Sequence, residues 1–231
     1  MIISPEDLVK GENEMTLSNI ELTISHMNNN LLRMGFLVET QIKRAIRALT
    51  EKDMKLAELL IREDVQINDL MRSIEDEAIR LIATQGPVAS DLRNIFTVIK
   101  IVTDLERMGD HAKDIAEITL KNKDILTDVI NEDLIEISRL VMKFISESLD
   151  SFVAKDHEKA QELTKMDDEI DRLTTESIGK LYDKAQNDPT LLRLAGELQF
   201  VLKYLERNGD HATNICEWTV YIVTGQFREL N

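Results

Sequence analysis

Hydrophobic side chains recur along most of the chain at the spacing of an α-helix. Ile42, Ala45, Ile46 and Leu49 form one such set, and comparable sets follow further on. Positions three and four apart fall on one face of a helix. Gly and Pro, which punctuate strands and hairpins, number only 8 and 3 in 231 residues. The pattern therefore predicts an all-helical chain. The expected helices cover residues 17–50, 53–84, 88–121, 131–154, 156–185 and 189–224.

Turn-forming residues stand where these helices are expected to end. Gly86 can close the second helix and Pro87 can open the third, because Gly favours the C′ position and Pro the first helical turn. Asp188 precedes Pro189 as a side-chain N-cap. Gly225 follows the last periodic stretch as a C-cap. Several of the predicted helices reach about 30 residues, or about 45 Å, which suits an elongated bundle.

One segment of thirteen residues occurs twice. Leu105–Glu117 reads LERMGDHAKDIAE and Leu205–Glu217 reads LERNGDHATNICE, with nine of the thirteen positions identical. A weaker echo lies upstream, where residues 64–70 resemble residues 167–173. The order of the parts thus repeats as well, which indicates a duplicated supersecondary unit. We predict an all-α fold of two tandem three-helix bundles, six long helices related by a pseudo-twofold internal repeat.

The polar segment Lys121–Asn131 loses the helical period and is the best candidate for a linker. It divides the chain into a first three-helix bundle over residues 16–125 and a second over residues 126–231. Residues 1–15 are acidic and lack an apolar run, so they are no signal peptide and are expected to form a loosely ordered arm.

Charge and cysteine content exclude several classes of function. Acidic residues exceed basic ones by 43 − 28 = 15, which disfavours general nucleic-acid binding and docking on anionic lipid. The single cysteine, Cys216, allows neither an intramolecular disulfide nor a thiolate zinc cage. It replaces Ala116 of the first copy on the core side, so we expect a buried, inert thiol. These features, and the lack of a long apolar stretch, predict a cytoplasmic protein.

The repeated segment places acidic side chains on one helical face, opposite its apolar residues. On a helical wheel Asp110, Asp114 and Glu117 fall close to Glu106, and the second copy repeats the set with Asn214 in one position. Folding the preceding helix back brings a second acidic motif to the same height. Paired oxygen ligands on adjacent helices suit Mg²⁺, Ca²⁺, Mn²⁺ or iron. The candidate metal ligands are Glu106, Asp110, Asp114, Glu206, Asp210, Asn214, Asp64, Asn68, Asp167 and Asp171.

Simpler interpretations of the same residues stay open. An acidic stripe opposite a core face can be an ordinary solvated surface. Gly109 and Gly209 can mark a close helix contact or leave room for a cation. His111 and His211 can pack or hydrogen-bond beside the site, or ligate a metal directly. The spacing of a ferritin-like di-iron centre is absent, since no His has a Glu three residues before it.

The segments Asp104–Ala112, Tyr204–Glu217, Leu81–Arg93 and Thr219–Gly225 resemble the signatures of the PhoU family of phosphate transport system regulatory proteins. The resemblance covers residues 25–227 approximately. It implies two three-helix bundles whose acidic motifs hold multinuclear clusters of iron or zinc. The oxygen ligands themselves leave magnesium or manganese as alternatives. Asn68 departs from the acidic pattern, so the first site is expected to be weaker or differently occupied.

The resemblance also implies a function. It predicts a cytoplasmic, non-catalytic regulator that represses the phosphate-starvation response. Such a protein couples the ATPase subunit of a phosphate ABC transporter to a sensor histidine kinase, self-associates as a homodimer and reaches the membrane only through its partners. The alternatives from the residues alone are a metal-dependent helical enzyme or metal store, and a purely structural helical protein.

Overall fold

The computed structural model describes the backbone of residues 5–230 and the side chains of residues 19–230. Within these ranges every regular element is helical, which confirms the all-α prediction. None of the described helices combines the length and the apolar run that a bilayer span requires. The elements are α1 (Pro5–Thr50), α2 (Met54–Glu63), α3 (Val65–Gln85), α4 (Ala89–Lys121), α5 (Asn131–Ala154), α6 (His157–Leu163), α7 (Lys165–Asn187), the 3₁₀ turn η1 (Pro189–Leu191) and α8 (Leu192–Thr224).

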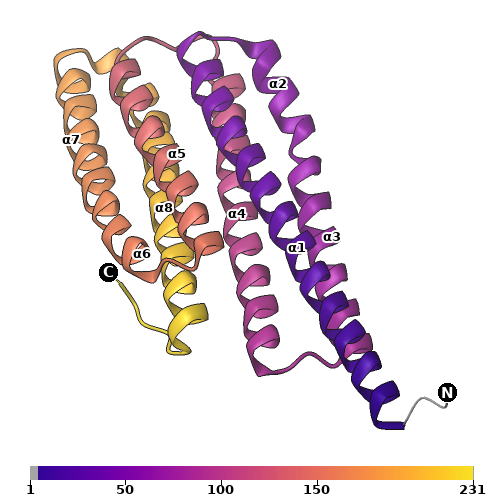
Figure 1. Ribbon diagram of the computed structural model, residues 1–231. Helices are drawn as coiled ribbons and strands as arrows, with labels where there is room; N and C mark the ends of the chain where they lie inside the picture. Colours follow the sequence, from indigo (N-terminus) through magenta and orange to yellow (C-terminus); the bar gives the residue numbers. More distant parts are fainter. Residues whose placement is uncertain (1–4, 231) are drawn as a thin grey trace.

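Six rods result, because α2 continues into α3 and α6 into α7 (Figure 1). The chain folds into two similar groups of three rods, and α4 of the first group packs against α8 of the second. α1 also packs against α5, with the Asn131 amide donating a hydrogen bond to the Thr50 carbonyl oxygen at 3.3 Å. Large apolar side chains such as Met27, Leu31 and Phe144 fill the interior. The repeated motifs on α4 and α8 therefore lie where the two groups meet. The exact domain boundaries stay a prediction.

The second rod of each group is interrupted, which the sequence pattern did not predict. The expected helices 53–84 and 156–185 break at Asp64 and Thr164 respectively. Both breaks are tight turns in which an amide donates to the carbonyl three residues earlier: Ile67 to Asp64 at 3.1 Å, and Asp167 to Thr164 at 2.9 Å. Each interruption adjoins the acidic motif of its rod and so sets the direction of those carboxylates.

Most predicted helix ends are confirmed, with two corrections. Gly86 and Gly225 have positive φ values of 56° and 73° and end α3 and α8, and Asp188 caps η1. Pro87 does not open α4, because Val88 is extended and serves as the N-cap one residue later. α1 begins at Pro5 rather than near residue 17, because its early residues include strong helix formers such as Glu, Lys and Met. It overlaps the arm expected over residues 1–15, of which residues 1–4 lie outside the described part.

Candidate metal sites and the repeat interface

The two repeated histidines lie between α4 and α8. His111 is buried, and its Nδ1 donates to Oδ1 of Asn208 at 2.7 Å. His211 Nδ1 pairs with Oδ1 of Asp104 at 2.8 Å. The two ring centroids are 5.7 Å apart. Both histidines therefore pack and form hydrogen bonds across the interface. This is one of the two roles considered for them, the other being direct metal ligation.

Corresponding positions of the two copies surround these rings. His111 stacks on Tyr204 with centroids 5.2 Å apart, whereas His211 meets Asp104, the residue that corresponds to Tyr204. The Asn214 amide also donates to Asp104 Oδ1 at 2.9 Å. Burial, and then the nearby Asp114 carboxylate, raise the pKa of Tyr204. Two of the candidate ligands, Asp114 and Asn214, thus have neighbours across the α4–α8 interface.

Four carboxylates of the second group form one electrostatic cluster on α7 and α8, consisting of Asp167, Asp171, Glu206 and Asp210. Asp167 is buried, and this burial together with the charges of Asp210 and Asp171 raises its pKa to about 7. Burial raises the pKa of Asp171, and the negative charges of Glu206 and Asp210 raise it further. Lys203 pairs with Glu206 at 2.5 Å, so one of the four charges is compensated. The cluster concentrates negative charge around a buried carboxyl group.

Asp167 fits against the backbone of α8 because Gly209 has no side chain. A Cβ added at Gly209 would lie 2.6 Å from Asp167 Oδ1 and 3.3 Å from Cδ1 of Ile170. Folding the preceding helix back about residue 188 predicts Asp167 and Asp171 level with Asp210 and Glu206, and the charges of Asp210 and Glu206 do act on these two carboxyl groups. Asp167 Oδ1 and the neighbouring Thr213 hydroxyl, which lowers the pKa of Asp167, are both buried without a well-formed hydrogen bond in the described part of the chain. A buried anionic oxygen that lacks a donor is a position that a hard cation can satisfy.

The corresponding cluster of the first group comprises Asp64, Asn68, Glu106 and Asp110. Asp64 is buried, but Lys113 Nζ lies 3.4 Å from its Oδ2 and the Asn68 amide donates to the same oxygen at 3.1 Å. Burial raises the pKa of Asp110, and the negative charge of Asp64 raises it further. The positive charge of Lys113 lowers it. The first cluster therefore contains its own cation.

Two details separate the groups. Thr213 occupies the position of Lys113 in the second copy, so Asp167 lacks the ammonium group that Asp64 has. In the first group Gly109 lies against Ile67, whose Cδ1 would be 2.9 Å from an added Cβ. Gly209 lies against the corresponding Ile170 and also against Asp167 Oδ1. The charge of Asp64 raises the pKa of Asp110, so Asp64 approaches the height of Asp110 as the fold-back of the second helix predicts. At both glycines the structure shows the close helix contact.

The oxygen donors of both clusters have the chemistry that hard divalent cations prefer, and the unsatisfied Asp167 oxygen makes the second cluster the better fit. Over the described residues, no group of three or more His, Cys, Asp or Glu side chains is arranged to hold a metal ion. Metal binding by these residues stays a prediction.

Sequence reasoning missed the partners of the histidines, which are Asp104, Asn208 and Tyr204. A signal was present, because Asp104 and Tyr204 differ at matched positions, as do Met108 and Asn208. Differences between otherwise identical copies mark positions where each copy faces a different neighbour.

The fold and its acidic clusters define an all-helical, internally duplicated protein with a carboxylate patch on each half. Residues 31–119 and 134–219 each match the family model described as the PhoU domain. The chain belongs to the PhoU family, as the resemblance predicted.

Relatives in both sequence and structure support this membership. The chain is 42% identical over 219 residues to the phosphate-specific transport system accessory protein PhoU homolog of Clostridium acetobutylicum, covering 94% of this chain and 100% of that protein. The crystal structure of PhoU from Pseudomonas aeruginosa superposes with a TM-score of 0.83 at 33% identity, covering 89% of this chain and 99% of that one. The crystal structure of the phosphate transport system regulatory protein PhoU from Streptococcus pneumoniae superposes with a TM-score of 0.82 at 29% identity. The match covers 90% of this chain and 99% of that one.

Proposed function

We propose that this chain is a regulator of phosphate uptake that associates with a phosphate transporter and represses the phosphate-starvation response. Its similarity over 94% of its length to a phosphate-specific transport system accessory protein carries the proposal. It couples the ATPase subunit of the transporter to a sensor histidine kinase, in the cytoplasm and without catalysing a reaction. The word accessory in the names of its relatives supports a non-catalytic role.

Deletion of the gene tests the regulatory role. A promoter induced by phosphate starvation is fused to a reporter, and its activity is measured in phosphate-rich medium with and without the chain. We expect the deletion strain to express the reporter at the level of starved wild-type cells, because the repressing contact is lost. Normal repression in the deletion strain contradicts the proposal.

We also propose that the acidic clusters bind iron or zinc, or alternatively magnesium or manganese. Asp167, Asp171, Glu206 and Asp210 would hold the ion of the second group, and the bound cation would supply the positive charge that this buried cluster lacks. Elemental analysis tests this by measuring the metal content of the untagged wild-type protein and of the double variant Asp110→Asn, Asp210→Asn. Equal metal content in both proteins contradicts the sites.

We also propose that the chain self-associates as a homodimer, as the family resemblance implies. Light scattering coupled to gel filtration measures the mass of the purified chain directly. A particle of one 26.5 kDa chain at micromolar concentration contradicts a stable homodimer.

A further inference from the structure

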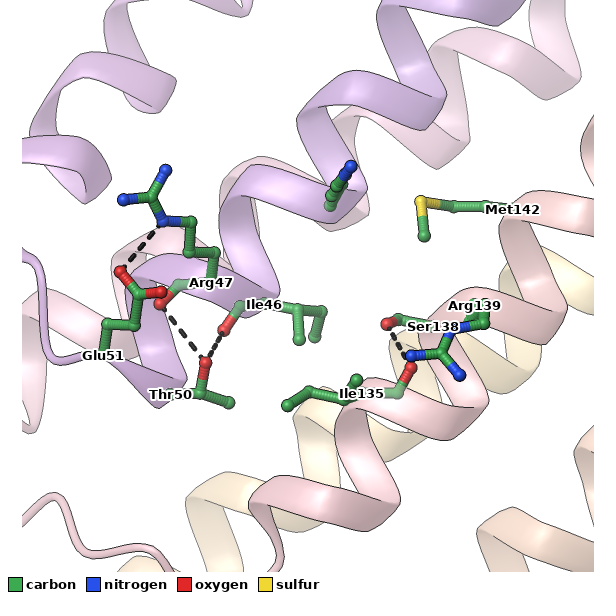
Figure 2. Close-up of a pocket in the computed structure, with 9 residues that line it drawn as sticks. Ile46, Arg47, Thr50, Glu51, Ile135, Ser138, Arg139 and Met142 are labelled. Carbon is green, nitrogen blue, oxygen red and sulfur yellow. Dashed lines mark hydrogen bonds and ion pairs between the residues drawn. The ribbon is translucent and has the colours of Figure 1, made fainter.

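A groove runs between α1 and α5, along the line where the two groups of helices meet (Figure 2). It consists of two adjoining hollows of about 220 and 620 Å³, which share Lys43, Arg139 and Met142. Its lining extends along α1 from residue 36 to residue 51, just past the end of the helix, and from residue 135 to 147 on α5. At 1.5 Å per residue these stretches are about 22 and 18 Å long. The groove is therefore long and shallow rather than a closed cavity.

The floor of the groove is apolar. Ile46 and Ile135 lie across from each other, and the Met142 sulfur points into the space between the helices (Figure 2). Phe36 continues the floor along α1 and is 69% exposed, while Ile135 is 42% exposed. Met142 lines both hollows and so lies between Phe36 and Ile135 along the groove. A partner seated in the groove would cover these apolar side chains.

Cations line both sides of this floor. Lys43 and Arg47 come from α1, and Arg139 and Lys143 from α5. Such a concentration is unusual in a chain whose net charge is −15. Both helices therefore present positive charge around an apolar strip.

The carboxylates of the groove leave part of this charge uncompensated. Glu51 accepts from Arg47 Nε at 2.9 Å, and Glu147 lies 3.7 Å from Lys143. Glu39 also lines the groove. Within the described residues Lys43 and Arg139 form no ion pair. Four cations thus face three carboxylates, and two of these carboxylates are already paired.

We propose that this groove docks an acidic amphipathic helix of the phosphate transporter, a proposal that rests on the transporter association given above. A groove about 20 Å long with Phe36, Ile46, Ile135 and Met142 along it accommodates the i, i+3, i+4 and i+7 side chains of a helix, whereas a small oxyanion gains nothing from its length. The cations on both sides complement acidic residues that flank such an apolar stripe. A symmetric contact with a second copy would place this positively charged patch against the same patch of the other copy.

Binding of the purified transporter ATPase subunit to the whole chain tests the groove. Lys43→Glu combined with Arg139→Glu is compared with Lys55→Glu combined with Arg193→Glu. The second pair makes the same charge change at exposed positions on α2 and α8. We expect the groove variant to bind at least tenfold more weakly and the control variant to stay within about twofold of wild type, with circular dichroism showing that both fold.

The outcomes separate the two proposals. If wild type binds and the groove variant binds equally well, the groove is not the docking surface, while the transporter association stands. If wild type does not bind the subunit, the proposed association with the transporter is wrong. The proposal that a transporter helix occupies the groove is then wrong as well.

A photo-crosslinking experiment identifies the occupant. Benzoylphenylalanine is placed at Phe36 in the groove or, as a control, at Phe200 on α8, which is 59% exposed. We expect a crosslink only from position 36, to an acidic transporter peptide with apolar residues at helical spacing. Crosslinks to a second copy of this chain, or to the transporter from position 200 alone, overturn the proposal.

Discussion

The protonation of Asp167 is coupled to folding. Its pKa in the folded chain is about 7, against about 3.9 for an unperturbed Asp. The folded state therefore binds the proton more tightly than the unfolded state does. The resulting stability is complete below pH 4 and is lost as pH rises through 7. At 1.36 kcal/mol per pKa unit, the loss is at most about 4 kcal/mol.

Asp167→Asn removes this dependence. At pH 8 without divalent cations, we expect the free energy of unfolding of the variant to exceed that of wild type by up to about 4 kcal/mol. At pH 5 we expect a smaller difference between the two proteins. Urea unfolding at both pH values measures the effect. Asp168→Asn, the same change at the exposed neighbour, is the control and should alter stability little. A pH dependence that is identical in Asp167→Asn and wild type contradicts the interpretation of this buried carboxyl group.

Cys216 provides a second test at the residue scale. Its side chain is fully buried, and burial raises the pKa of the thiol to about 12. Because the thiolate is the reactive form, dithiobisnitrobenzoate should modify the native protein at least 100-fold more slowly than the unfolded chain, followed by absorbance. Rapid modification of native protein contradicts the prediction of an inert buried thiol.

The candidate carboxylates were predictable from single residues because two copies of one motif repeat the same acidic order. The partners of His111 and His211 were not. A helical wheel shows which face a side chain is on, but not which residue of a distant helix lies opposite. Only the packing of α4 on α8 brings Asp104 and Asn208, about a hundred positions away in sequence, within hydrogen-bond distance.

At the scale of elements, glycines report how closely helices approach. Gly209→Ala places a Cβ against Asp167 and Ile170, so we expect a loss of about 1–3 kcal/mol in unfolding free energy. Gly179→Ala on α7 is the matched control, because nothing lies within 4 Å of its added Cβ. It should gain up to about 1 kcal/mol from helix propensity. Thermal unfolding of the two variants gives the comparison, and equal behaviour contradicts a tight α7–α8 contact.

The rods were predictable from apolar periodicity, but their interruptions were not. Leu60, Ile67, Ile74 and Leu81 are all buried at a spacing of seven residues, and this spacing continues unchanged through the break at Asp64. A single tight turn keeps the apolar face on the same side of the rod. The hydrophobic pattern therefore gives no sign that the backbone changes from one helix to the next.

For the whole molecule, the packing of α4 on α8 and of α1 on α5 predicts that both groups of helices unfold together. The only tryptophan, Trp218, lies on α8 and reports on the second group. Gly109→Ala destabilises the first group, because its Cβ would press on Ile67. In Gly109→Ala we expect the unfolding midpoint measured by Trp218 fluorescence to shift from its wild-type value by as much as the midpoint measured by circular dichroism. Two separate transitions contradict this coupling.

The segment between α4 and α5 that joins the two copies in one polypeptide has a consequence for how the protein can evolve. In an assembly of two identical subunits, every mutation appears on both sides of the symmetry axis. Here one gene encodes both sides separately. One copy can therefore carry Lys113 and the other Thr213, and one Asp104 and the other Tyr204, without the difference being copied. Each half can therefore hold different side chains around its own cluster on the same helical frame.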